Sequence, residues 1–266
     1  MGYNNSKETA SLFSNYGIHK AQLSSSKLMV LAILGGAFIA FGGLLTVMVA
    51  GGMPVIGAEN PGLVKLMAGA LFPVGLIMVS IAGADLFTSD CAGMVFPCLQ
   101  KQINVKTLLK VWGISYTFNF FGAQLVTFFL ADATGLLSSS PYKDYLHHLA
   151  EAKIHYSFDT VFLKGIGANW LVCLGTWMGI AGKDIAGKAI GIWVPIMTFV
   201  AIGFEHSIAN MFYIPAAIYS GADITWGAFI LNNLIPATLG NIVGGSIFVG
   251  CAYWYVYLKP TIRVSK

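Results

Sequence analysis

The sequence predicts an all-α integral membrane protein with six membrane spans, and three observations support this fold class. First, 56% of the 266 residues are hydrophobic and only 10% are charged, against about 25% in soluble domains. Second, the apolar residues gather in stretches long enough to cross a bilayer, which takes about 20 residues. Third, the two halves of the chain resemble each other. A chain with a mean hydropathy of +0.73 is expected to fold in lipid.

The first 27 residues are polar and come before any membrane span. They contain no short apolar core followed by a small-residue cleavage site, so we expect no cleaved signal peptide. The first apolar segment is therefore expected to stay in the membrane.

Four apolar stretches each fit one continuous span. Residues 28–50, 107–131 and 160–181 have the length that a bilayer requires. Residues 226–258 are somewhat longer, so we expect this span to tilt or to run out of the bilayer.

Two further stretches, residues 66–99 and 186–219, do not fit this pattern. Each has 34 residues, which is too long for one span and too short for two spans with a turn. Each carries polar residues near its middle, "GADLFTSD" in the first and "GFEHSIAN" in the second. We therefore predict one interrupted helix in each stretch, giving six spans in total.

The two halves share an ordered set of residues, which indicates an internal repeat of three spans. Because three is odd, the second copy must lie inverted in the membrane. The matched residues are Gly83 and Asp85 with Gly203 and Glu205 at a spacing of 120, and Asn119 with Asn241 and Pro73 with Pro195 at a spacing of 122.

The basic residues predict the orientation, because cytoplasmic loops carry an excess of lysine and arginine. With the N-terminus inside, eleven basic residues face the cytoplasm and four face outside. The chain is thus predicted to be a multi-pass protein of the cell inner (plasma) membrane, with both termini cytoplasmic. The inside residues are Lys7, Lys20, Lys27, Lys101, Lys106, Lys110, Lys183, Lys188, Lys259, Arg263 and Lys266, and the outside ones Lys65, Lys143, Lys153 and Lys164.

We accordingly predict a single membrane channel domain covering residues 1–266. Its parts are a cytoplasmic N-terminal segment (1–27), a first repeat (28–131), an extracellular connection (132–159), a second repeat (160–258) and a cytoplasmic tail (259–266). The net charge of +4 is explained by the inside lysines, and no soluble basic domain points to nucleic acid.

The helix breaks predict a pore. Unpaired backbone in hydrocarbon costs several kcal/mol per group, so a broken helix is tolerated only inside protein or along a cavity. Two breaks in inverted copies should meet near the midplane, where the N-termini of the half-helices favour an anion. His206, beside the second break, is expected to be functional, although it could be an interhelical hydrogen-bond donor only.

Other polar residues at the breaks have structural alternatives. Asp85 and Glu205 could accept backbone N–H groups or pair across the repeat, and Thr88 and Ser89 could cap the second half-helix. Lys153 is either a solvated loop residue or a charge that gathers anions at the mouth of a vestibule.

Three blocks of the chain carry a family resemblance: "GADLFTS", "AKIHYSF" followed by "GANWLVCLGTWM", and "GFEHSIANMFYIP". They resemble the signature blocks of the formate–nitrite transporter family, over about residues 20–260. Within that family the chain is most similar to the hydrosulfide ion channel branch. The resemblance implies an aquaporin-like protomer in a homopentamer, with one pore in each protomer.

The resemblance also implies roles for single residues, which composition alone would leave as ordinary core. Thr88 and His206 match a polar pair between two hydrophobic constrictions, Lys153 a vestibule lysine and Asn169 a pore-lining asparagine; Glu205 is added to the substrate pathway. Lys164 stands where an apolar residue is expected. The outer constriction is assigned to Phe72 and Phe199, and the inner one to Leu76, Phe87 and Val172 with Leu86 beside it.

The predicted function is a passive channel for small monovalent weak-acid anions: hydrosulfide first, with formate and nitrite also permeating. Two alternatives stay open, a proton-coupled formate or nitrite transporter and a pore for water or glycerol. Paired Asn-Pro-Ala motifs, which would favour the latter, are absent. An enzyme is not expected, because no cofactor loop, nucleophile motif or metal-binding pair is present. No cofactor is predicted.

Overall fold

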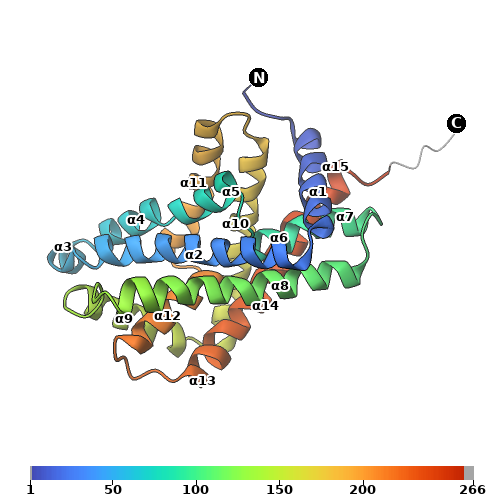
Figure 1. Ribbon diagram of the computed structural model, residues 1–266. Helices are drawn as coiled ribbons and strands as arrows, with labels where there is room; N and C mark the ends of the chain where they lie inside the picture. Colours follow the sequence, from blue (N-terminus) through green and yellow to red (C-terminus); the bar gives the residue numbers. More distant parts are fainter. Residues whose placement is uncertain (1, 261–266) are drawn as a thin grey trace, which may run out of the picture.

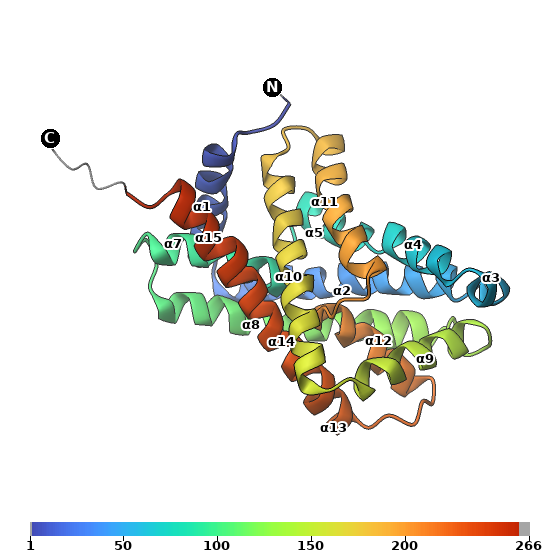
Figure 2. The same cartoon turned by 180° about the vertical axis from the view of Figure 1, so that it is seen from behind.

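The computed structural model describes residues 2–260, which form a bundle of helices (Figures 1 and 2). Arg263 and Lys266, counted above as cytoplasmic charges, lie outside the described residues, as does most of the predicted tail. The first half contains α1 (Ser6–Gln22), α2 (Ser25–Ala50), α3 (Pro54–Glu59), α4 (Pro61–Leu71), α5 (Val74–Ala82), α6 (Phe87–Gly93), α7 (Val95–Leu99), α8 (Val105–Gln124) and the π-helical segment η1 (Leu125–Asp132).

The second half follows the same plan after a connecting helix, α9. It contains α9 (Tyr142–His155), α10 (Phe158–Ala181), α11 (Ile185–Ala201), α12 (Ser207–Tyr219), α13 (Trp226–Ala228), η2 (Phe229–Leu234), α14 (Ile235–Gly245), η3 (Ser246–Cys251) and α15 (Ala252–Tyr257).

All four predicted continuous spans are confirmed as long apolar helical segments: Ser25–Ala50, Val105–Asp132, Phe158–Ala181 and Trp226–Tyr257. The last is 32 residues long and runs obliquely across the bundle as α13 to α15 (Figure 2). Its length follows from its slope, since a tilted helix needs more residues to cross the same thickness.

Both predicted interrupted helices are present, although the first begins earlier than expected. It starts at Pro61 rather than at residue 66, and the part before the break, Pro61–Ala82, is by itself long enough to cross a membrane. The side chain of Asn60 accepts the N–H of Leu63 and so fixes the early start. Lys65, which sequence reasoning took as a polar boundary, lies inside the helix, because its long side chain can still reach water.

The first and third spans of each half pack closely, α2 against α8 and α10 against α14 (Figures 1 and 2). Glycines allow this approach. A Cβ atom at Gly122 would collide with the carbonyl oxygen of Ile33, and one at Gly244 with that of Ile166. The same contact therefore occurs in both halves, as small residues at membrane helix interfaces commonly permit.

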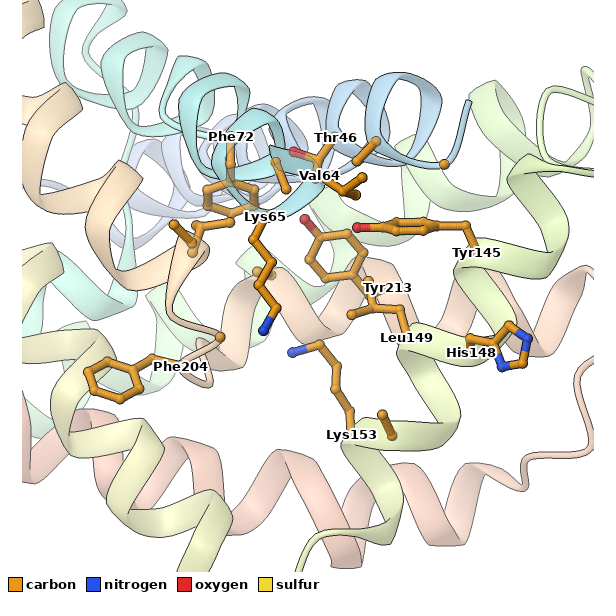
Figure 3. Close-up of a pocket in the computed structure, with 18 of the residues that line it drawn as sticks. Thr46, Val64, Lys65, Phe72, Tyr145, His148, Leu149, Lys153, Phe204 and Tyr213 are labelled. Atoms are coloured by element: carbon orange, nitrogen blue, oxygen red, sulfur yellow. The ribbon is translucent and has the colours of Figure 1, made fainter. Parts of the chain in front are cut away.

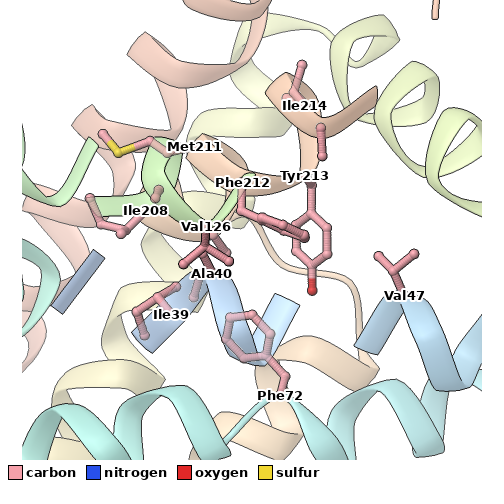
Figure 4. Close-up of a cluster of buried hydrophobic side chains, with 14 of the residues drawn as sticks. Ile39, Ala40, Val47, Phe72, Val126, Ile208, Met211, Phe212, Tyr213 and Ile214 are labelled. Carbon is pink, nitrogen blue, oxygen red and sulfur yellow. The ribbon is translucent and has the colours of Figure 1, made fainter. Parts of the chain in front are cut away.

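A continuous apolar core lies between the two halves. Figure 4 shows one part of it, where Phe72, Phe212 and Tyr213 meet side chains of α2 such as Ile39. Phe72 and Tyr213 stack with ring centroids 6.4 Å apart.

The N-terminal helix α1 is packed onto the bundle rather than extended from it. It contacts α7, α10 and α15, so the first and last described helices lie at the same end of the molecule (Figures 1 and 2). An even number of spans requires this arrangement.

Candidate functional site

The two helix breaks have the same backbone geometry. Gly83 ends α5 with φ +82°, and Gly203 follows α11 with φ +79°, both in the left-handed region that glycine adopts without strain. Three residues without regular structure come next in each half, and α6 and α12 begin at Phe87 and Ser207. The breaks are thus two copies of one local structure.

One asparagine holds each break in place. Asn119 accepts the N–H of Phe87 at 2.9 Å and donates to the carbonyl oxygens of Ala32 and Asp85. These bonds satisfy backbone groups that the interrupted helix leaves open.

In the second half, Asn241 makes the same three bonds. It accepts the N–H of Ser207 at 2.9 Å and donates to the carbonyl oxygens of Gly165 and Glu205. Asn119 and Asn241 were matched in the sequence only by spacing, and the structure gives that spacing its reason.

These contacts correct part of the prediction for the half-helix N-termini. The half-helix N-termini were expected to favour an anion, yet the N–H groups of Phe87 and Ser207 at these ends are already bonded. In α12 the N–H of Ala209 is also occupied, by His206. The helix ends keep their partial positive charge but offer fewer free donors.

Thr88 and His206, from opposite halves, are hydrogen bonded at 2.9 Å and fully buried. His206 Nδ1 accepts the N–H of Ala209, so Nε2 is the nitrogen that carries the hydrogen and donates to Thr88 Oγ1. The hydroxyl hydrogen of Thr88 is therefore left to donate elsewhere. The alternative that Thr88 and Ser89 cap α6 is wrong, because α6 has no side-chain cap and Ser89 bonds Thr176 instead.

Asn169, on α10, lies beside this pair. Its Nδ2 donates to the carbonyl oxygens of Thr88 at 3.1 Å and Asn241 at 2.7 Å. Its Oδ1 is buried and has no hydrogen-bond partner among the described residues. The amide that bonds the Thr88 backbone thus also carries a buried acceptor without a partner in the described chain.

The residues assigned to the constrictions are all buried in one core cluster. Phe72 and Phe199 meet edge to face with centroids 5.9 Å apart and border the outer cavity. The structure has an outer cavity on the side of Lys153 and an inner cavity on the side of Lys20, both described below. The other four residues, Leu76, Leu86, Phe87 and Val172, border neither of them.

The outer cavity has a volume of about 790 Å³ and is lined by α4, α9 and the second break. Lys65 and Lys153 extend into it from opposite walls, with Tyr213 and Tyr145 between α9 and α2 (Figure 3). Lys164 also borders the cavity, and its ammonium lies 3.6 Å from the centre of the Tyr156 ring. Three ammonium groups therefore surround this space.

Lys153 is not a free charge, because it binds Glu205 at 3.0 and 3.1 Å. Asn210 and Asn233 donate to the same carboxylate at 2.7 and 3.1 Å. The alternative in which Glu205 accepts backbone N–H groups is therefore wrong, because the donors to its carboxylate in the described chain are side chains. A buried charge pair of this kind is stable only because further hydrogen bonds complete it.

Sequence reasoning missed Lys20, the corresponding lysine of the first half. Its ammonium contacts Asp85, as that of Lys153 contacts Glu205. No signal in the sequence pointed to this match, because Lys20 and Lys153 differ by 133, whereas the residues matched between the halves differ by 120 or 122. The polar N-terminal segment was treated as a cytoplasmic extension, so its register with the repeat was not considered.

An inner cavity of about 300 Å³ lies on the side of α1. Lys20 and Asp85 border it together with Ser89 and Thr176. The breaks, the Thr88–His206 pair and the aromatic pair thus lie between two cavities.

With this geometry in view, comparison with known protein families matches residues 7–255 to the family described as formate/nitrite transporter. The chain belongs to the formate/nitrite transporter family. Since this is a family of transporters and channels, the protein is a multi-pass membrane transport protein and not an enzyme.

Individual relatives agree with this assignment. The chain is 47% identical to a probable formate transporter of Methanothermobacter thermautotrophicus, over 95% of this chain and 96% of the relative. Among solved structures, one described as a pentameric formate channel with formate bound is 34% identical, with a TM-score of 0.78 over 88% of this chain and 98% of that one. Another, described as an FNT family ion channel, is 27% identical, with a TM-score of 0.86 over 94% and 98%.

Proposed function

We propose that this protein is a passive channel for small monovalent anions of weak acids, with formate as the first substrate. Hydrosulfide, expected first from the sequence, and nitrite carry the same single charge and are proposed to pass by the same route. Formate is named before hydrosulfide and nitrite because a relative at 47% identity is named a probable formate transporter and a similar solved structure is described as a formate channel.

The observation that carries the proposal is the Thr88–His206 pair between two apolar layers. An anion that enters an apolar constriction loses water, and fixed donors must replace it. Because His206 donates to Thr88, the Thr88 hydroxyl is free to donate to an anion. Thr88, His206 and Asn169 form the polar centre of the proposed pathway.

The proposed route begins in the outer cavity. Lys65 and Lys164 raise the local anion concentration there, while the Lys153–Glu205 pair supplies a neutral but polar wall. The anion then passes Phe72 and Phe199, reaches the polar centre, crosses the apolar layer of Leu76, Leu86, Phe87 and Val172, and leaves through the inner cavity.

The geometry favours passive passage over a proton relay through His206. Protonation of Nδ1 would remove the acceptor that now caps α12 through Ala209. A relay therefore has to break this cap in every cycle, whereas a hydrogen-bond role leaves it intact. Proton-coupled transport remains the alternative function.

We further propose a homopentamer with both termini in the cytoplasm. The solved formate channel that resembles this chain is described as pentameric. The common location of α1 and α15 at one end, together with the excess of lysine on that side in the sequence, supports the orientation.

The proposal is tested by replacing Thr88 with valine, which keeps the shape and removes the hydroxyl. Formate flux into proteoliposomes is expected to fall about tenfold or more, the effect of losing one hydrogen bond to a charged solute. Thr127→Val is the matched control, since Thr127 is buried but donates only to the carbonyl oxygen of Ala123. If Thr88→Val carried as much formate as the control Thr127→Val, the proposed pathway would be contradicted.

A further inference from the structure

The lysine–carboxylate cluster at the inner end of the molecule has one more carboxylate than the cluster at the outer end. At the outer end one lysine, Lys153, faces one carboxylate, Glu205. At the inner end one lysine, Lys20, faces two carboxylates, because its ammonium contacts both Asp85 and Asp90. The repeat supplies the first pair, and at the same spacing of 120 Asp90 stands where the second half has Asn210, a neutral side chain that donates to Glu205.

The inner cluster is almost completely shielded from water. The exposed fractions are 6% for Lys20, 1% for Asp85 and 0% for Asp90. If all three groups were ionised, the cluster would hold one uncompensated negative charge in a site without bulk water. Such a charge is costly, and two carboxylates in one site resist ionising together.

The hydrogen bonds do not compensate for the second charge. Ser115 donates to Asp85 Oδ2 at 2.5 Å, and Tyr16 lies at the limit of hydrogen bonding, 3.5 Å from Asp90 Oδ1. The other oxygen, Asp90 Oδ2, is buried and has no hydrogen-bond partner among the described residues. Glu205, by contrast, receives bonds from Lys153 and two asparagines.

The remaining ionisable groups around the cluster do not balance it through a contact. Besides Lys20, Asp85 and Asp90 themselves, these groups are Tyr16 and His19 on α1, Cys91 on α6, Cys173 on α10 and Lys188 on α11. Of the cations in and around the cluster, only Lys20 forms an ion pair with these carboxylates within the described chain.

We propose that Asp85 and Asp90 form a proton-binding site that holds one proton at neutral pH. One carboxyl and one carboxylate then face the single ammonium, and the buried cluster is neutral. The unpartnered Asp90 Oδ2 gains a hydrogen that it can donate. The ligand of this site is a proton, which reaches it through the inner cavity that Asp85 and Lys20 border.

The transport consequence rests on the proposed function. With the proton bound, the inner mouth carries no net charge from this cluster. Without it, the cluster is negative and repels an anion that approaches from the inner cavity. Anion entry from this side is therefore expected to weaken as the pH on this side rises, while the outer cavity, with its one-to-one pair, keeps its charge.

The site is tested by infrared spectroscopy of the full-length protein in lipid, because the carbonyl stretch of a protonated carboxyl is separate from that of a carboxylate. At neutral pH the wild type is expected to show this band, and Asp90→Asn is expected to lose the band of one carboxyl per protomer. Asp85→Asn should lose it as well, because either change leaves one carboxylate for one lysine. Asp159→Asn, at an exposed position, is the matched control and should keep it.

Identical bands in the wild type and in both cluster variants would overturn the proton site. The result is separate from transport: if the band behaves as expected but no formate crosses the membrane, the proton site stands and the proposed function fails. Size-exclusion chromatography of each variant shows whether it is folded and assembled as the wild type is.

Discussion

Asn119 and Asn241 make the same three hydrogen bonds in opposite halves of the molecule. Each accepts the first N–H of a half-helix and donates to two carbonyl oxygens, one in the break and one in the first span of its repeat. The two interrupted helices are therefore stabilised by two buried amides.

Replacing Asn119 or Asn241 with alanine is expected to destabilise the fold by at least about 2 kcal/mol. Each change leaves buried backbone groups without a partner, at about 1–3 kcal/mol per group. Thermal unfolding in detergent measures the loss. Asn104→Ala, which removes an exposed helix cap, is the control and should cost about 1 kcal/mol; losses no larger than this at the two buried sites would contradict the assigned role.

Gly122→Ala and Gly244→Ala are expected to separate the close helix pairs and lower the melting temperature. In both cases the new Cβ atom meets a backbone carbonyl oxygen, of Ile33 or Ile166, which cannot move as a side chain can. Gly113→Ala on α8 is the matched control. Nothing lies within 4 Å of its Cβ position, so alanine should stabilise the helix by about 1 kcal/mol or less.

Lys153→Met is expected to destabilise the protein by about 3 kcal/mol or more, because it leaves Glu205 buried without its cation. Adding Glu205→Gln should restore much of the loss, and a double-mutant cycle on unfolding measures this coupling. Lys164→Met, at a partly exposed position over Tyr156, is expected to cost less than about 1 kcal/mol. If Lys153→Met were as mild, the pair would not be important for stability.

His206→Asn separates the hydrogen-bond role from a proton relay. Asparagine is a favourable N-cap and can replace Nδ1 as the acceptor for Ala209, while its shorter side chain gives up the bond of Nε2 to Thr88. We expect formate flux to keep the pH dependence of the wild type, measured in proteoliposomes over a range of pH. A flux that no longer responds to pH would instead support the relay and proton-coupled transport.

Most of the fold could be predicted from the sequence, because lipid requires each membrane-spanning helix to be apolar over its whole length. Apolar length predicted the four continuous spans, and the polar interruptions predicted the two broken helices. The start of α4 was missed, since one lysine near a helix end does not mark the boundary of a span.

The candidate site was only partly predictable. Thr88 and His206 were paired by resemblance, and the structure places them 2.9 Å apart. The partners of Asp85 and Glu205 were not predictable from composition, because each binds a lysine brought close by tertiary packing. Lys20 was missed because α1 looks like a polar extension until its contacts with the bundle are known.

The most direct test of the account is anion flux into liposomes that contain the purified protein, with formate, nitrite, hydrosulfide and chloride compared against empty liposomes. The account predicts that the three weak-acid anions cross while chloride lags far behind. If none of the anions crosses but water or glycerol does, the two breaks form a neutral pore and the proposed function is wrong.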